Sequence, residues 1–148
     1  MVGEKEKDIF NQDTLLVMAV RTLENQFGEE IVDRIVEWKH DQTKENWEEI
    51  SESEGRTDPE YLFRLFDDNV HDYDVIEKNR DRLEVKVESC KHAEIFKKFN
   101  AADVGKKMSC AGDQAVVEGF NPEINFERPE VLMDGDDSCH FIFELQKE

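Results

Sequence analysis

The sequence predicts an α+β fold, in which N-terminal helices pack on an antiparallel sheet of about four strands. Apolar residues recur at helical spacing through the first half of the chain, and apolar and charged residues alternate from Leu83 onward. Glycine, proline and asparagine separate the later apolar segments, as turns require. At 148 residues, the chain is long enough for one domain with a buried core. We therefore expect a single domain, 1–148, with a helical half over 1–72 and a mixed strand and helix half over 73–148.

Three helices are expected in the helical half. Residues 9–27 carry apolar side chains on one face, and Gly28 ends the pattern. A second helix begins at Glu29 and can continue to Gly55, because no proline or glycine interrupts it. Asp58-Pro59-Glu60 then predicts a third helix, with the aspartate as N-cap and the proline in the first turn.

The mixed half starts with a strand pair. Alternation over 83–88 predicts a half-buried strand, and the segment 73–77 can pair with it across a turn at 78–81. A short helix follows Cys90, and one or two more surround Gly105 and Gly112. The chain ends in an apolar segment at 124–126, a break, a turn and a last strand.

The last strand orients two candidate side chains. Cys139, Phe141 and Phe143 share one apolar face, so the thiol should point into the core while His140 points the other way. His40 and His71 are both expected in acidic helices, exposed to solvent. Some of five aromatic residues should line a pocket over the sheet: Trp38, Trp47, Tyr61, Phe63 and Phe66.

The charge and the cysteine content of the chain limit which binding partners and which cellular compartment are expected. The net charge of −18 disfavours nucleic acid and anionic membranes, which bind clustered lysine and arginine. A stretch of about 18 apolar residues, as a membrane span requires, does not occur, and residues 1–8 have no apolar signal core. Three distant cysteines do not form a disulfide framework and fit the reducing cytosol. A small molecule is the expected partner of a cytoplasmic protein, and the oligomeric state is left open.

The three cysteines mark the region where chemistry is expected. Cys110 is followed by Asp113, and Cys139 lies between acidic residues and a histidine. Thiolate chemistry depends on neighbours that lower the pKa of the thiol. The first half of the chain has no cysteine, so a reactive centre should lie between residues 88 and 141.

Each candidate has more than one interpretation. Cys110 is the best candidate for a nucleophile, with Asp113 on the same helical face, but a buried cysteine beside a helix-capping aspartate gives the same pattern. Cys90, Cys110 and Cys139 could instead hold zinc or another divalent metal ion. No Cys-x-x-Cys pair occurs, so the spacing does not decide whether a metal is bound.

The constellation resembles the L-2-amino-thiazoline-4-carboxylic acid hydrolase family. The resemblance covers residues 83–145 and rests on these features: Cys90 at a strand end, Gly105, Cys110 with Asp113, Phe120-Asn121-Pro122, and Gly135-Asp136-Asp137-Ser138-Cys139-His140-Phe141-Ile142-Phe143. His140 and Ile142 depart from the family pattern, where aspartate and arginine are expected.

The resemblance implies a cysteine-dependent hydrolase that opens a cyclic C–N bond in a small thiazoline-like or amidine-like molecule. Cys110 would attack the ring carbon, Asp113 would orient the substrate or relay protons, and Cys139 with Cys90 would complete the pocket. Arg128 would supply the guanidinium that is missing after Cys139, and His140 is a further candidate for substrate binding. The alternative is a non-catalytic, sensor-like module that binds a small molecule or metal through the same cysteines. A domain that only mediates interactions, with no site, is the third possibility.

Overall fold

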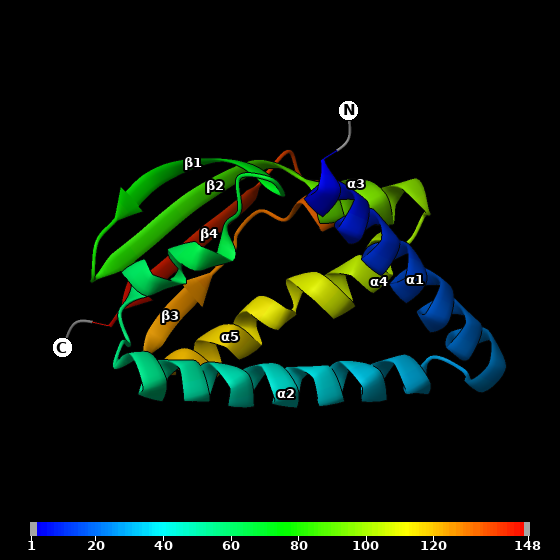
Figure 1. Ribbon diagram of the computed structural model, residues 1–148, viewed down its shortest axis with the longest axis horizontal. Coiled ribbons are helices and arrows are strands. Elements are labelled where there is room, and N and C mark those ends of the chain that lie inside the picture. The colour runs from blue at the N-terminus through cyan, green and yellow to red at the C-terminus, as the bar shows by residue number, and fades with distance from the viewer. Residues whose placement is uncertain (1–2, 147–148) are drawn as a thin grey trace.

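The computed structural model describes residues 3–146 and has a layer of helices against one face of a four-stranded sheet (Figure 1). The α-helices among these residues are α1 Glu4–Phe27, α2 Glu30–Glu54, α3 Lys91–Lys98, α4 Ala102–Gly105 and α5 Gly112–Phe120. Shorter helical segments are η1 Pro59–Leu65 and η3 Leu132–Asp134, both 3-10, and the π-helical turn η2 Lys106–Cys110. The strands are β1 His71–Lys78, β2 Arg82–Cys90, β3 Ile124–Glu127 and β4 Cys139–Leu145.

The two long helices follow from the spacing of their buried residues and from the glycines that end them. In α1, Ile9, Val17 and Val20 are buried on one face. Gly55 ends α2 with a φ of 62°, and its N–H donates to the carbonyl of Ser51. A residue with a Cβ adopts this left-handed conformation at a cost, so glycine is favoured there. None of the helices between residues 3 and 146 combines the length and the apolar composition that crossing a membrane requires.

The sheet has the strand order β1-β2-β4-β3, and every neighbouring pair is antiparallel. In its register, Val87 of β2 lies opposite Cys139 of β4, and His71 of β1 lies opposite Cys90. Cys90 and Cys139 are therefore brought to the same end of the sheet, although 49 positions separate them in the sequence. Antiparallel pairing has this effect because the end of one strand lies beside the start of the next.

The core lies between the sheet and the helices. Leu83, Val85 and Phe143 are fully buried on the inner face of the sheet, and Phe96 of α3 and Val117 of α5 belong to the same buried cluster. Burial of each such side chain stabilises the fold by about 1.5–3 kcal/mol. The opposite face carries the charged alternate residues of the strands, so α+β with helices on one side is confirmed.

Two local expectations are wrong. Asp58 occupies the N-cap position of η1 but makes no capping hydrogen bond, because its carboxylate accepts hydrogen bonds from Arg56 at 2.5 and 2.7 Å. His71 begins strand β1 and does not lie in an exposed helix. Its ring packs edge-on against Phe66, and burial lowers its pKa to about 4.

The aromatic residues are placed by core packing. Trp47 and Tyr61 pack around Phe120, and Phe63 and Phe66 pack against Tyr73. Trp38 is 71% exposed on α2. None of the five candidate aromatics is among the described residues that line the cavity holding the cysteines. Trp47 and Tyr61 instead border a shallower depression between α2 and η1.

Candidate functional site

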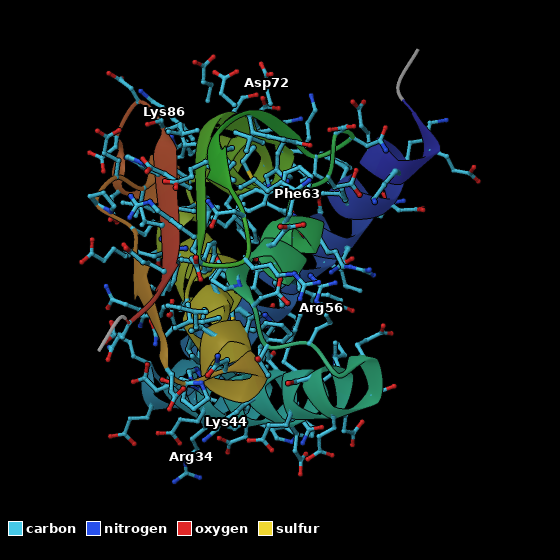
Figure 2. All side chains as sticks on the ribbon, turned by 90° about the vertical axis from the view of Figure 1, so that its left-hand side faces the viewer. Arg34, Lys44, Arg56, Phe63, Asp72 and Lys86 are labelled. Carbon is cyan, nitrogen blue, oxygen red and sulfur yellow. The ribbon has the colours of Figure 1, made fainter. Side chains whose placement is uncertain are left out.

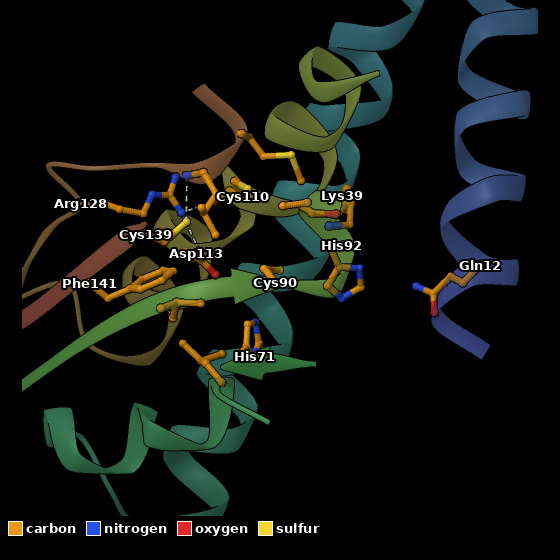
Figure 3. Close-up of a pocket in the computed structure, with 16 residues that line it drawn as sticks. Gln12, Lys39, His71, Cys90, His92, Cys110, Asp113, Arg128, Cys139 and Phe141 are labelled. Carbon is orange, nitrogen blue, oxygen red and sulfur yellow. Dashed lines mark hydrogen bonds and ion pairs between the residues drawn. The ribbon is translucent and has the colours of Figure 1, made fainter. Parts of the chain in front are cut away.

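A cavity of about 320 Å³ opens at the end of the sheet where β2 and β4 meet the helices, and all three cysteines line it (Figure 3). Its polar lining residues are Gln12, Lys39, His71, Cys90, His92, Ser109, Cys110, Asp113, Arg128 and Cys139. Alanine, leucine, valine, methionine and phenylalanine side chains form the rest of the wall. A concave space in which polar groups converge between apolar side chains is the usual form of a small-molecule site.

Three element ends place the thiols. Cys90 is the last residue of β2 and the N-cap of α3, and Cys139 is the first residue of β4. Cys110 ends η2, two residues before α5 begins. In that π-helical turn the Ala111 N–H donates to the carbonyl of Lys106, five residues back. Such turns disturb the regular helix and often occur at functional sites.

Burial determines the protonation of the thiols. The pKa of Cys110 is raised to about 12, mainly by burial, and Arg128 opposes that shift only in part. Burial also raises the pKa values of Cys90 and Cys139. The Cys139 sulfur accepts a hydrogen bond from the Leu132 N–H at 3.2 Å. The thiols are therefore protonated at neutral pH, and the expectation that neighbouring groups lower the pKa of Cys110 is wrong.

The charged centre of the cavity is the ion pair of Asp113 and Arg128. The Arg128 Nη1 donates to the Asp113 carboxylate at 2.7 Å and to the Cys110 carbonyl at 3.0 Å. The guanidinium lies near the rings of Phe126 and Phe141, and its Nε is buried without an acceptor among the described residues. Burial raises the pKa of Asp113 to about 6, against the lowering effect of Arg128 and Lys39.

Five polar residues that line the cavity are not among the site residues expected from the sequence, and one of them, His92, pairs with a buried carboxylate behind it. His92 of α3 binds Asp13 of α1, with Nδ1 and Oδ2 2.5 Å apart. The sequence does contain a signal for Asp13, because this charged residue lies on the same helical face as Ile9 and Val17, which are buried. Lys39 and His71 carry no comparable signal, because only the packing of α2 and β1 brings them to the cavity.

His140 lies elsewhere. Its Nε2 is 2.7 Å from Glu84 on β2, on the charged face of the sheet, and it is not among the described residues that line the cavity. The structure thus brings together Cys90, Cys110, Asp113, Arg128 and Cys139, and it leaves His140 outside that group.

The arrangement of the thiols bears on metal binding. Within residues 3–146, no group of three histidine, cysteine, aspartate or glutamate side chains is placed so that it could hold one metal ion. The three thiols share a cavity without converging on one point, and a zinc site needs such convergence of its ligands.

The raised pKa of Asp113 gives a test of the site by pH. Because the folded protein binds this proton more tightly than the unfolded chain, stability should fall as pH rises from about 3.8 to about 6. The free energy of unfolding of the wild type, relative to Asp113→Asn, should decrease by up to about 1.4 kcal/mol per pH unit in that window and level off above it. Urea unfolding of both proteins at several pH values measures the difference. A flat or rising difference would show that the carboxyl is not desolvated.

In comparisons with known proteins, the chain matches the model of one enzyme family. The family model described as L-2-amino-thiazoline-4-carboxylic acid hydrolase matches residues 6–143. No curated protein matches the chain significantly. Among solved structures, a trafficking protein particle complex subunit 3 from Naegleria fowleri, covalently bound to palmitic acid, is 9% identical with a TM-score of 0.49, covering 95% of this chain and 96% of that one. An Fe(II) unliganded H-NOX protein from K. algicida is 12% identical with a TM-score of 0.44, covering 92% and 97%.

Proposed function

Because this chain belongs to the L-2-amino-thiazoline-4-carboxylic acid hydrolase family, we propose that it hydrolyses a cyclic C–N bond in a small thiazoline-like or amidine-like carboxylic acid. The observation that carries the proposal is the cavity in which three thiols meet the Asp113–Arg128 pair. The family match covers most of the chain, so it includes the elements that form this cavity.

The size of the cavity suits a single small ring compound. A volume of about 320 Å³ lies at the lower end of the range of roughly 300–1,000 Å³ that is typical of small-molecule sites. All three cysteines are free, which fits the proposed cytoplasmic location.

The charges in the cavity suit a molecule with a carboxylate and an amidine. Arg128 and Lys39 can bind the carboxylate, and Arg128 thereby replaces the arginine that is missing after Cys139. The Asp113 carboxylate can accept the N–H groups of the amidine. Because both signs of charge face one cavity, the site favours a zwitterion or an amidine acid.

The protonated state of Cys110 defines how it would react. A thiol with a pKa of about 12 must lose its proton as it attacks, and the ring nitrogen of an amidine is a base at the right place. The sulfur bonds to the ring carbon, the π pair of the C=N bond moves to nitrogen, and the thiol proton follows it. The exocyclic nitrogen then re-forms a C=N bond as the ring C–N bond breaks, and the ring nitrogen keeps the electron pair and takes a proton from the exocyclic nitrogen. The opened substrate stays attached to Cys110 until water releases it.

A non-catalytic small-molecule-binding module is the second candidate. The neutral thiols favour it, because a binding pocket needs no thiolate. The two candidates differ in turnover and not in binding.

The deciding experiment is incubation of the purified protein with L-2-amino-thiazoline-4-carboxylate, with ring opening followed by mass spectrometry and binding by calorimetry. Time-dependent, enzyme-proportional ring opening supports the hydrolase. Stoichiometric binding without ring opening supports the binding module, and neither binding nor ring opening would contradict both.

Arg128 should determine the preference for a carboxylate. We expect Arg128→Leu to raise KM for the thiazoline acid by about 10- to 100-fold, because a hydrogen bond to a charged group contributes roughly 1.5–3 kcal/mol. The same variant should change KM for 2-amino-thiazoline, which has no carboxylate, much less. Equal losses for both compounds, measured by steady-state kinetics, would show that Arg128 only supports Asp113. Circular dichroism of the variant checks that loss of the buried pair leaves the fold intact.

A further inference from the structure

His92, which lines the same cavity, belongs to a second polar pair, contributed by different elements from the Asp113–Arg128 pair. Asp13 of α1 and His92 of α3 are joined by the 2.5 Å contact between Oδ2 and Nδ1. The Asp13 side chain is only 2% exposed, whereas the His92 side chain is 29% exposed and borders the cavity. In Figure 3, the His92 ring lies beyond Cys90, on the side of the cavity toward α1.

The contact determines which ring nitrogen can accept a proton. A carboxylate at Nδ1 holds the hydrogen of a neutral imidazole on that nitrogen and leaves Nε2 with a free lone pair. The same buried carboxylate stabilises the imidazolium that forms when Nε2 takes a proton. A histidine in this arrangement is oriented to act as a general base.

The other histidine of the cavity has the opposite arrangement. The Nδ1 of His71 accepts a hydrogen bond from the Asp67 N–H at 3.1 Å, so the proton of its neutral ring is on Nε2. Burial lowers its pKa to about 4, which keeps this ring neutral at pH 7. His71 can therefore donate a hydrogen bond to a bound molecule, while His92 can accept a proton.

We propose that His92 is the general base that activates water in this cavity and that Asp13 is its positioning residue. The inference rests on the proposed hydrolysis and adds the step that releases the product from Cys110. His92 Nε2 takes a proton from water as the water oxygen bonds to the carbon held by the Cys110 sulfur and the π pair of its C=N bond moves to nitrogen. The C=N bond then re-forms as the C–S bond to Cys110 breaks, the electron pair of that bond returns to the Cys110 sulfur, and the proton on Nε2 passes to this sulfur to restore the thiol. One water molecule is consumed and both side chains regain their starting states.

The Asp13–His92 pair also links α1 to α3, so the test must distinguish a general base from a residue that only stabilises the packing of these helices. The substitution His92→Asn does so, since an asparagine amide can still donate to Asp13 from the position of Nδ1 but has no basic nitrogen. We expect kcat to fall by about 100- to 10,000-fold, the usual contribution of a general base, with KM changed by less than about threefold. The thermal unfolding midpoint should stay near that of the wild type.

His140→Asn is the matched control. His140 also pairs with a carboxylate, that of Glu84 at 2.7 Å, but it lies outside the cavity lining. This control should retain wild-type kcat and KM. If the wild type turns over the substrate and His92→Asn does so equally fast, the inference is overturned.

A second measurement decides the inference without turnover. Long-range ¹H–¹⁵N NMR of the wild type should show the hydrogen of the neutral His92 ring on Nδ1, and Asp13→Asn should weaken that preference. A ring protonated on Nε2 would overturn the proposal whatever the kinetics show. Absence of hydrolysis by the wild type would count against the proposed function, and the tautomer would still decide whether His92 is oriented to accept a proton from the cavity.

Discussion

Replacement of Cys110 by alanine should reduce turnover of L-2-amino-thiazoline-4-carboxylate by about 1,000-fold or more, because loss of a nucleophile removes the covalent route. The fold should survive, since the substitution removes one sulfur from the wall of a cavity and not from the closed core. Cys110→Ser should be nearly as inactive, because a hydroxyl is a weaker acid and a weaker nucleophile than a thiol. Steady-state kinetics and circular dichroism of both variants measure these effects.

Trapping the covalent intermediate on Cys110 tests the same assignment by direct detection. Acid quenching of the wild type during turnover, followed by peptide mass spectrometry, should place the adduct on the peptide that contains Cys110 and not on those with Cys90 or Cys139. Full activity of Cys110→Ala would show that the nucleophile assignment is wrong. Unfolding of the variant together with loss of a bound metal would favour the metal-binding alternative.

Gly119→Ala should cause the largest loss of stability. Gly119 of α5 lies against α2, and a Cβ placed on it would be 2.2 Å from the Lys44 carbonyl oxygen and 2.9 Å from its carbon. Figure 2 shows α5 lying along α2 beside Lys44. These are backbone atoms, so the helices must separate, and we expect the free energy of unfolding to fall by about 3 kcal/mol or more. Urea denaturation measures the change.

Gly112→Ala is the matched control on the same helix. A Cβ there would meet only the Lys39 Nζ at 3.7 Å, an ordinary contact. Since alanine is favoured over glycine in a helix by up to about 1 kcal/mol, this variant should be as stable as the wild type or slightly more stable. Equal effects of the two substitutions would contradict the close approach of α5 to α2.

Much of the fold could be predicted because its cause is local. The alternation around Leu83 and Val85 identifies β2, and Gly28 and Gly55 mark the ends of the long helices. The segment 73–77 is likewise predicted as a strand, but β1 begins two residues earlier, at His71, because pairing with β2 extends the strand over polar residues that carry no alternating pattern.

The candidate site was predictable in part. Cys110 and Asp113 lie close together in the sequence, and the motifs around Cys90 and Cys139 identified the other thiols. Asp13, Lys39 and His92 could not be assigned, because their proximity depends on how α1 and α2 pack on the mixed half. Long-range contacts of this kind leave no periodic pattern in the sequence.

The sequence by itself determined the α+β class, the order of the elements and the region that holds the cysteines, since these depend on periodicity, turns and residue type. Only the tertiary structure decided the chemical state of the site. The pKa of Cys110 rises to about 12 and that of Asp113 to about 6 because the folded protein removes both groups from water. The same packing sets His92 against Asp13 and leaves His140 on the opposite face of the sheet, and desolvation and proximity of this kind exist only once the chain has folded.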